Sequence, residues 1–260
     1  MVYNNRSKTG YISYSNSKFN YSYKGFCSIV CGLIDMALEH YIENDNFNIE
    51  IDEHQTLKLF ENISPKTDQK YNVGEWWLER FFSNEIYQQQ YNAHTPANVE
   101  NIKIKNKVYT NILKIKDEYL EKFENKKIEL NIDCDTLGVQ IRGTDKKTEL
   151  PELQLDHIFK SIDKLNKEKI FIATDDKFYL DALLDRYGNK IIYDNSITIS
   201  DNQKSIHHNS SDRYKINEEV LSNVYLLSQC KYFLYSFSNV SLLALIMGIN
   251  SFKFIDYLNK

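Results

Sequence analysis

The second half of the chain alternates short apolar runs with longer runs of helical spacing, and this alternation limits the folds open to it. The clearest apolar run, 169–173, has almost no polar residue, as in a strand buried on both faces. Strands that alternate with helices indicate a parallel sheet with right-handed crossovers. We therefore expect an α/β fold, with strands at 137–141, 169–173, 190–193 and 232–235.

Polar clusters directly follow three of these strands, at 142–149, 174–176 and 236–239. The carboxyl ends of parallel strands meet at one edge of the sheet, where open α/β sheets bind their ligands. Arg142 could donate two parallel hydrogen bonds to phosphate oxygens, and Lys146 adds a second cation. Segment 236–239 precedes a helix, whose free N–H groups would suit a phosphate. Taken alone, 142–149 also fits a solvated turn; the convergence of three clusters favours a binding site.

The first half gives weaker signals. Alternation within residues 1–24 predicts a short strand or an ordered lead-in, and the polar run 126–134 suits a junction between two halves. Gly25 precedes a helix start, where a glycine would let a ligand approach the backbone; an ordinary turn also explains it. The expected elements are helix 29–41, strand 47–51, and helices 75–91 and 102–123.

Charge and composition exclude several classes of function. The net charge of -4 leaves no dominant basic face, which argues against a nucleic-acid partner. The longest apolar stretch, 224–249, is interrupted by polar residues, so we expect no membrane span. The four cysteines lack the spacing of a metal site, and Cys27 and Cys31 fit buried thiols. Because the first residues are also unlike a signal peptide, we expect a cytoplasmic protein.

Four motifs give the second half a resemblance to the α-1,6-fucosyltransferases, within the wider group of GDP-fucose transferases. Segment 138–149 matches a family pattern of Gly-Val-His-Val-Arg-Arg-Thr-Asp-Lys followed by a Glu. The other three are Ile-Ala-Thr-Asp-Asp at 172–176, Asp-Asn-Ser-Ile at 194–197, and Leu-Ser-Gln at 227–229 running on to Phe237 and Ser238. They occur in the family's order and spacing across a little under half of the chain, 138–247.

The resemblance implies a GT-B architecture, in which two Rossmann-like domains face each other across a cleft. Residues 1–130 would form the acceptor-side domain, and residues 131–260 would bind the nucleotide sugar. It also implies an inverting transfer of the sugar to a glycan hydroxyl. The expected partners are a nucleotide sugar and a glycan acceptor, with no cofactor and no required metal.

By position, the resemblance also implies a role for each polar cluster. Arg142 would bind the diphosphate, Lys146 would support it as the leaving group gains charge, and Glu149 would be the base, with Asp145 in reserve. Asp175 and Asp176 would organise the site; adjacent side chains on a strand point in opposite directions, which argues against a metal pair. The expected nucleotide-sugar site comprises Gln140, Arg142, Asp175, Asp176, Asn223, Ser236, Ser238, Asn239 and Gly25.

Three departures from the family pattern limit what the resemblance implies. The spacing from Lys146 to Glu149 is one residue shorter, and Gln140 replaces a histidine. Asn223 stands where the family has the aspartate that reads guanine. An amide offers one donor and one acceptor, which suits uracil, so a UDP-sugar such as UDP-xylose competes with GDP-fucose as the expected donor.

Two other classes of function remain open from the sequence. A nucleotide-binding protein that has lost transfer activity would keep Arg142 and lack a working base, as the shortened spacing before Glu149 allows. A lectin-like module would need no phosphate site, and the phosphate-directed clusters argue against it. The sequence therefore favours a glycosyltransferase.

Overall fold

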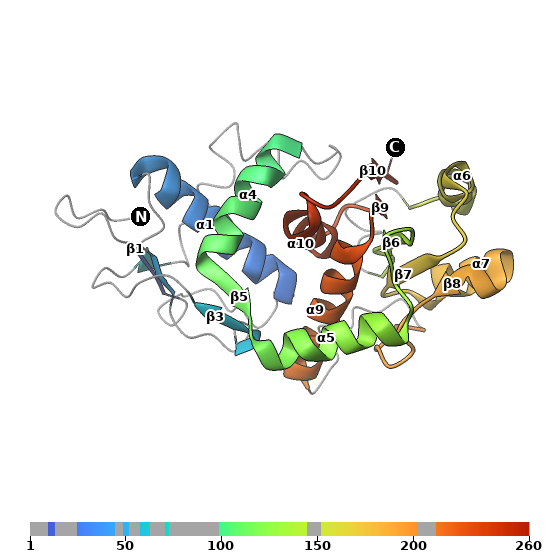
Figure 1. Cartoon of the computed structure of the whole chain (residues 1–260), viewed down its shortest axis with the longest axis horizontal. Helices are drawn as coiled ribbons and strands as arrows, with labels where there is room; N and C mark the ends of the chain where they lie inside the picture. Colours follow the sequence, from blue (N-terminus) through green and yellow to red (C-terminus); the bar gives the residue numbers. More distant parts are fainter. Residues whose placement is uncertain are drawn as a thin grey trace. The chain divides into compact units, whose positions relative to one another are not determined.

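The computed structural model describes residues 10–13, 25–44, 49–51, 58–62, 71–72, 99–144, 152–201 and 212–259 (Figure 1). The chain divides into two compact units, Met1–Leu120 and Glu121–Lys260. The predicted helix 75–91 and catalytic residues 145–149 lie outside the described residues.

The second unit is built on a five-stranded sheet, in which every pairing is parallel. The strand order is β10-β9-β6-β7-β8. The strands are β6 (Leu137–Ile141), β7 (Ile170–Thr174), β8 (Ile191–Ile192), β9 (Tyr232–Tyr235) and β10 (Phe254–Tyr257). The predicted α/β fold with a parallel sheet is confirmed; β10 was not predicted.

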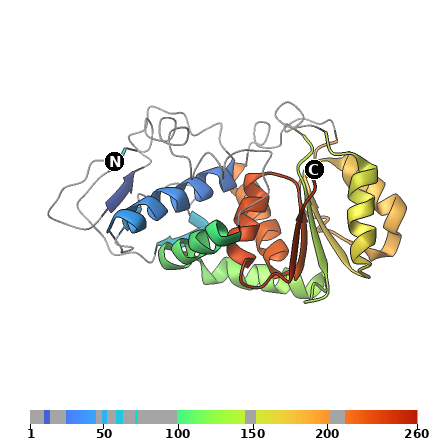
Figure 2. The same cartoon turned by 90° about the horizontal axis from the view of Figure 1, so that it is seen from above.

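Helices cover both faces of this sheet. They are α6 (Leu155–Leu165), α7 (Lys177–Tyr187), α9 (Arg213–Gln229) and α10 (Asn239–Gly248), with a 3₁₀ turn at Gly188–Lys190. Figure 2 shows α6 and α7 on one face of the sheet and α9 and α10 on the other. All five residues of β6 and all five of β7 are buried, which explains their almost unbroken apolar sequences.

The chain order of the strands creates a switch point beside β6. From β6 the chain moves outward to β7 and β8, and then returns to place β9 and β10 on the other side of β6. Ligands of open α/β sheets bind where the strand order reverses, outside the carboxyl ends of the strands.

Gly138 allows α9 to lie close to β6. A Cβ atom on Gly138 would lie 3.2 Å from the Cβ and Sγ atoms of Cys230 and from Cδ2 of Leu227. A larger residue would therefore push against the end of α9.

Asp133 forms hydrogen bonds at the start of β6. Its carboxylate accepts from Lys169 Nζ at 2.6 Å and from the backbone N–H of Asp135 at 2.9 Å. It also accepts from the hydroxyl of Thr136, a fully buried residue, at 3.1 Å. Lys169 directly precedes β7, so this carboxylate joins the starts of two neighbouring strands.

In its described residues, the first unit has two helices and two small sheets. β1 (Gly10–Ser13) pairs in parallel with β2 (Ile49–Ile51) and with β4 (Tyr71–Asn72), and β3 (Phe60–Asn62) pairs antiparallel with β5 (Leu113–Ile115). The helices are α1 (Phe26–Asn44) and α4 (Val99–Ile112), and α5 (Asp117–Glu129) crosses the boundary between the units. The predicted strand within 1–24, helix 29–41 and strand 47–51 are present in these elements.

The prediction of one helix over 102–123 was wrong. The helix ends at Ile112, and residues 113–115 form a strand whose partner is β3, with Phe60 opposite Ile115. Ile112, Leu113 and Ile115 are apolar and buried, so their spacing fits a helix as well as a strand, and only the pairing with β3 decides. The predicted junction 126–134 is partly helical, because α5 extends to Glu129.

A buried ion pair connects α1 and α4. Lys105 Nζ on α4 lies 2.6 Å from Asp35 Oδ1 on α1, and both side chains are 1% exposed. Burial raises the pKa of the Asp35 carboxyl, and Lys105 opposes this rise.

In the part of the chain that the structure describes, no helix is long and apolar enough to cross a membrane.

Candidate functional site

A pocket opens at the carboxyl edge of the five-stranded sheet, beside the switch point. It encloses about 520 Å³ of empty space, part of which is open to solvent. Strand ends, α9, the first turn of α10 and the segment after β8 contribute to its walls. The lining residues are Gln140, Arg142, Ala173, Thr174, Asp175, Ile197, Thr198, Ile216, Glu219, Val220, Asn223 and Val240.

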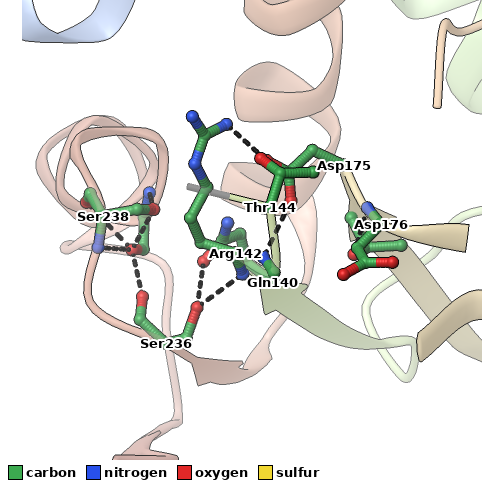
Figure 3. Close-up of polar contacts among 10 residues, drawn as sticks. Gln140, Arg142, Thr144, Asp175, Asp176, Ser236 and Ser238 are labelled. Atoms are coloured by element: carbon green, nitrogen blue, oxygen red, sulfur yellow. Dashed lines mark hydrogen bonds and ion pairs between the residues drawn. The ribbon is translucent and has the colours of Figure 1, made fainter. Parts of the chain in front are cut away.

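Arg142 follows β6 directly and is held at both ends. Its backbone N–H donates to Ser236 Oγ at 2.8 Å, and its Nη1 lies 2.7 Å from Asp175 Oδ2 (Figure 3). The Arg142 side chain is 12% exposed. The predicted phosphate anchor therefore lines the pocket with its guanidinium already positioned by an internal ion pair.

Asp175 organises the first residues of the loop after β6. Besides the ion pair with Arg142, its Oδ1 accepts from the Gly143 N–H at 2.8 Å and its Oδ2 from Thr144 Oγ1 at 2.6 Å. One carboxylate at the end of β7 thus fixes three consecutive residues beyond β6. The role in organising a nucleotide-sugar site, which the resemblance implies for Asp175, stays a prediction.

Asp176 has a different environment from its neighbour. Its Oδ1 accepts from the Phe178 N–H at 3.0 Å, as the N-cap of α7, and the residue is 2% exposed. Asp176 is not among the residues that line the pocket. The structure therefore places it as a helix cap behind the site, and the two adjacent carboxylates contact different partners.

Gly143 lies in close contact with Asp176. A Cβ atom on Gly143 would lie 2.5 Å from Asp176 Cβ and 2.9 Å from Tyr179 Cε2. Only a glycine fits here without displacing the backbone. Burial raises the pKa of Tyr179 to about 12, and its hydroxyl donates to the Leu153 carbonyl at 3.1 Å.

Ser236 joins the ends of β6 and β9. Its hydroxyl donates to Gln140 Oε1 at 3.2 Å while accepting from the Arg142 N–H (Figure 3). Ser236 is 1% exposed and does not line the pocket, whereas Gln140 does. Ser236 therefore connects the ends of β6 and β9 by hydrogen bonds.

Ser238 caps α10. Its Oγ accepts from the Ser241 N–H at 3.1 Å, and Ser241 Oγ accepts from the Ser238 N–H at 3.0 Å, which together form a capping box. Ser238 is 4% exposed. Asn239 begins the helix, and the next residue, Val240, lines the pocket. The predicted phosphate cradle is thus a capped helix start at the edge of the pocket.

Asn223 lines the pocket from α9, together with a residue that the sequence did not single out. Glu219 lies one helical turn before Asn223 and lines the same pocket, as do Ile216 and Val220. These four positions share one face of the helix, because they follow its period. That spacing was a signal for Glu219 in the sequence, since the helix begins at Arg213 and includes all four positions.

Four of the predicted site residues lie outside the described part of the second unit. Gly25 belongs to the first unit, where its carbonyl accepts from the N–H groups of Ser28 and Ile29 at the start of α1. Asp145, Lys146 and Glu149 lie outside the described residues, so their catalytic roles stay predictions. Within the described ranges, no group of three or more His, Cys, Asp or Glu side chains could hold a metal ion.

Solved structures similar to this chain include two kinds of fucosyltransferase. NodZ α-1,6-fucosyltransferase soaked with GDP-fucose is 17% identical, with a TM-score of 0.41, and the match covers 56% of this chain and 47% of that one. NodZ from Bradyrhizobium is also 17% identical, with coverages of 57% and 46% and a TM-score of 0.39. POFUT1 in complex with GDP-fucose is 10% identical, with coverages of 96% and 74% and a TM-score of 0.40.

The resemblance to fucosyltransferases predicted from the motifs is confirmed as a structural similarity. The chain spans under half the length of the NodZ structures that it matches. No protein-family model matches the sequence, and no curated protein does either. These low identities and TM-scores describe a structural likeness alone. They assign no function to the residues of the pocket.

Proposed function

We propose that the chain is a glycosyltransferase of the GT-B type, whose second unit binds a nucleoside diphosphate sugar. In this proposal, an inverting reaction moves the sugar, fucose or a related sugar, to a glycan hydroxyl without a metal ion. The observation that carries the proposal is the pocket at the switch point of the parallel sheet, which combines an anchored arginine with apolar side chains from α9. A nucleotide needs both features, a cation for its phosphates and an apolar surface for its base.

Arg142 would bind the diphosphate. Its position after β6, its ion pair with Asp175 and its N–H bond to Ser236 hold the guanidinium in place before the ligand arrives. A cation that is already positioned loses little freedom when the diphosphate binds and when charge develops on the departing phosphate. The start of α10 lies at the same pocket through Val240, and the positive end of a helix dipole favours an anion there.

Glu149 would accept the proton of the acceptor hydroxyl, with Asp145 as the reserve base and Lys146 beside the leaving group. General-base catalysis contributes roughly 10²- to 10⁴-fold to a rate. We expect E149Q to lower turnover by a factor in that range while the affinity for nucleoside diphosphate stays the same. If D145N shows this pattern instead, the reserve base is the working one.

A panel of nucleotide sugars tests the proposal. The protein is incubated with GDP-fucose, UDP-xylose and other donors, with and without glycan acceptors and with EDTA, and released nucleoside diphosphate is measured. We expect one donor to be turned over, with no loss of rate in EDTA. A donor that binds without turnover or hydrolysis would favour a binding protein that has lost transfer activity.

Arg142 offers a direct binding test. R142K keeps the charge but loses the planar pair of donors, and we expect about 10- to 100-fold weaker binding of the nucleoside diphosphate. The matched control is R186K on α7, where Arg186 forms an exposed ion pair with Asp163 at 2.7 Å. Equal affinities in R142K and R186K would contradict the proposed phosphate site.

A further inference from the structure

Glu219 lines the pocket and has an acceptor oxygen that no donor among the described residues satisfies. Its Oε2 accepts from the Thr198 N–H at 3.0 Å, which holds the side chain against the segment after β8. Its Oε1 is buried and has no hydrogen-bond partner among the described residues. Lys215 Nζ lies 3.8 Å from Oε1 on a side chain that is 65% exposed, whereas the Glu219 side chain is only 11% exposed.

A buried carboxylate oxygen without a donor costs free energy, and the cost is greater when the group is charged. A ligand that brings N–H or O–H groups to this oxygen would offset that cost. The phosphates of a nucleotide bring only acceptors and negative charge, so they cannot be the group that Glu219 contacts. The donor group that pairs with the Glu219 carboxylate therefore belongs to the base or the ribose.

The surroundings of Glu219 favour the base. Its neighbours on the same helix face, Ile216 and Val220, are apolar, and Ile197 adds a third apolar side chain to the lining. An aromatic base can pack on such a wall, whereas ribose hydroxyls would gain nothing from it. Asn223, one helical turn beyond Glu219, adds an amide that can donate as well as accept.

Among the common bases, guanine alone has two neighbouring donors on its pairing edge, N1–H and N2–H, with the acceptor O6 beside them. A carboxylate accepts from both donors, and an amide N–H can donate to O6. Uracil has a single N–H between two carbonyl oxygens, which a carboxylate would repel. In cytosine and adenine a ring nitrogen that accepts lies beside the amino group.

We infer that Glu219 and Asn223 together read the base of the donor nucleotide, and that this base is guanine. The inference rests on the proposed function, and it makes Glu219 the residue that supplies the carboxylate. Asn223 then serves as the donor to O6, so its amide does not direct the site toward uracil.

Calorimetry with GDP, IDP and UDP tests the inference. Inosine keeps O6 and N1–H but lacks the 2-amino group of guanine, so IDP isolates the second bond to the carboxylate. We expect the unmodified chain to bind GDP about tenfold more tightly than IDP, and more tightly still than UDP, since a bidentate contact to a base is worth about 1–3 kcal/mol. In E219Q the glutamine can accept from one guanine donor only, and the preference for GDP over IDP should fall to about onefold.

Two further variants locate the effect. N223A should weaken GDP and IDP by the same factor, because both bases carry O6. E218Q is the matched control, since Glu218 is the neighbouring residue on α9 and forms an ion pair with Lys122 at 3.1 Å. It should keep the order of affinities unchanged.

Several results would overturn the inference. Equal affinity of the unmodified chain for GDP and UDP contradicts it without any variant, so the test survives if E219Q fails to fold. Equal losses for all three nucleotides in E219Q would place Glu219 on the ribose. If none of the three binds, the proposed function fails together with the inference; if they bind without preference, only the inference fails.

Discussion

Arg142 and Asp175 follow neighbouring parallel strands, and the ion pair between Nη1 and Oδ2 joins the two strand ends at 2.7 Å. The same carboxylate accepts from the backbone of Gly143 and the hydroxyl of Thr144. Asp175 therefore holds the Arg142 side chain in the pocket and also holds the two residues that follow Arg142.

Asparagine substitutions at Asp175 and at Asp176 should show that the two carboxylates have different roles. D175N removes the charge opposite Arg142, and we expect it to lower the free energy of unfolding by about 1–3 kcal/mol, because hydrogen bonds to charged groups are the stronger ones. D176N should cost less, since asparagine caps a helix about as well as aspartate does. Urea denaturation of both variants measures the difference; equal losses would show that Asp175 has no special role.

Gly143 should tolerate no side chain. In G143A the new methyl group would lie 2.5 Å from Asp176 Cβ, so the backbone has to move, and we expect a loss of roughly 3 kcal/mol. G188A is the matched control: Gly188 has a φ of 55° but nothing within 4 Å of the added Cβ. We expect it to cost only the strain of the left-handed conformation, roughly 1–2 kcal/mol. Thermal or urea unfolding should rank the two variants in this order, and the reverse order would contradict the close contact.

The buried pair of Asp35 and Lys105 should behave as a unit. K105M leaves a buried carboxylate without its partner, and we expect a loss of about 3–5 kcal/mol at neutral pH. The double variant D35L/K105M removes both charges and should recover most of that loss. Urea denaturation of the full chain measures both, and additive losses would contradict the coupling.

The pH dependence of K105M provides an independent check. Burial already raises the pKa of Asp35, and removal of Lys105 takes away the influence that lowers it. A carboxyl whose folded-state pKa is raised is least destabilising below its unfolded pKa, which is about 3.9, and costs stability as the pH rises above that value. The loss in K105M should therefore shrink toward pH 4.

The contribution of Asp133 to stability should depend on pH in the opposite direction. The hydrogen bond from Lys169, with those from Asp135 and Thr136, lowers the pKa of the Asp133 carboxyl. Its contribution is present in full above the unfolded pKa of about 3.9 and is lost as the pH falls through the lower folded-state value. D133N should thus be less stable than the unmodified chain at pH 7, by a modest amount because the side chain is 44% exposed. The two should converge in acid, and a difference that is independent of pH would contradict the assignment.

The sequence predicted most of the second unit because its signals are local. The apolar runs of β6 and β7 and the periodic helices after them need no distant partner to be recognised. Strand β5 could not be recognised from local sequence, because it depends on the pairing of Ile115 with Phe60, which lies far away in the chain. Strand β10 likewise depends on its pairing with β9.

The candidate site was predicted in part. Arg142, Gln140, Asp175 and Asn223 line one pocket, which follows from strand ends meeting at one edge of the sheet. Residue type alone could not reveal that Asp176 and Ser238 are helix caps, because the same side chains cap helices and bind phosphates. Glu219 was missed because its significance lies in the burial of one oxygen atom.

The missing side chain at Gly138 sets how closely α9 approaches the sheet, through Cys230 and Leu227 at the far end of that helix. A single added methyl group would need those neighbours to yield by a few tenths of an ångström. Glu219 and Asn223 belong to the same helix, so their position in the pocket depends on a residue that is not among those lining it. If the pocket binds a nucleotide as proposed, a substitution at Gly138 should change the affinity for that nucleotide without contacting it.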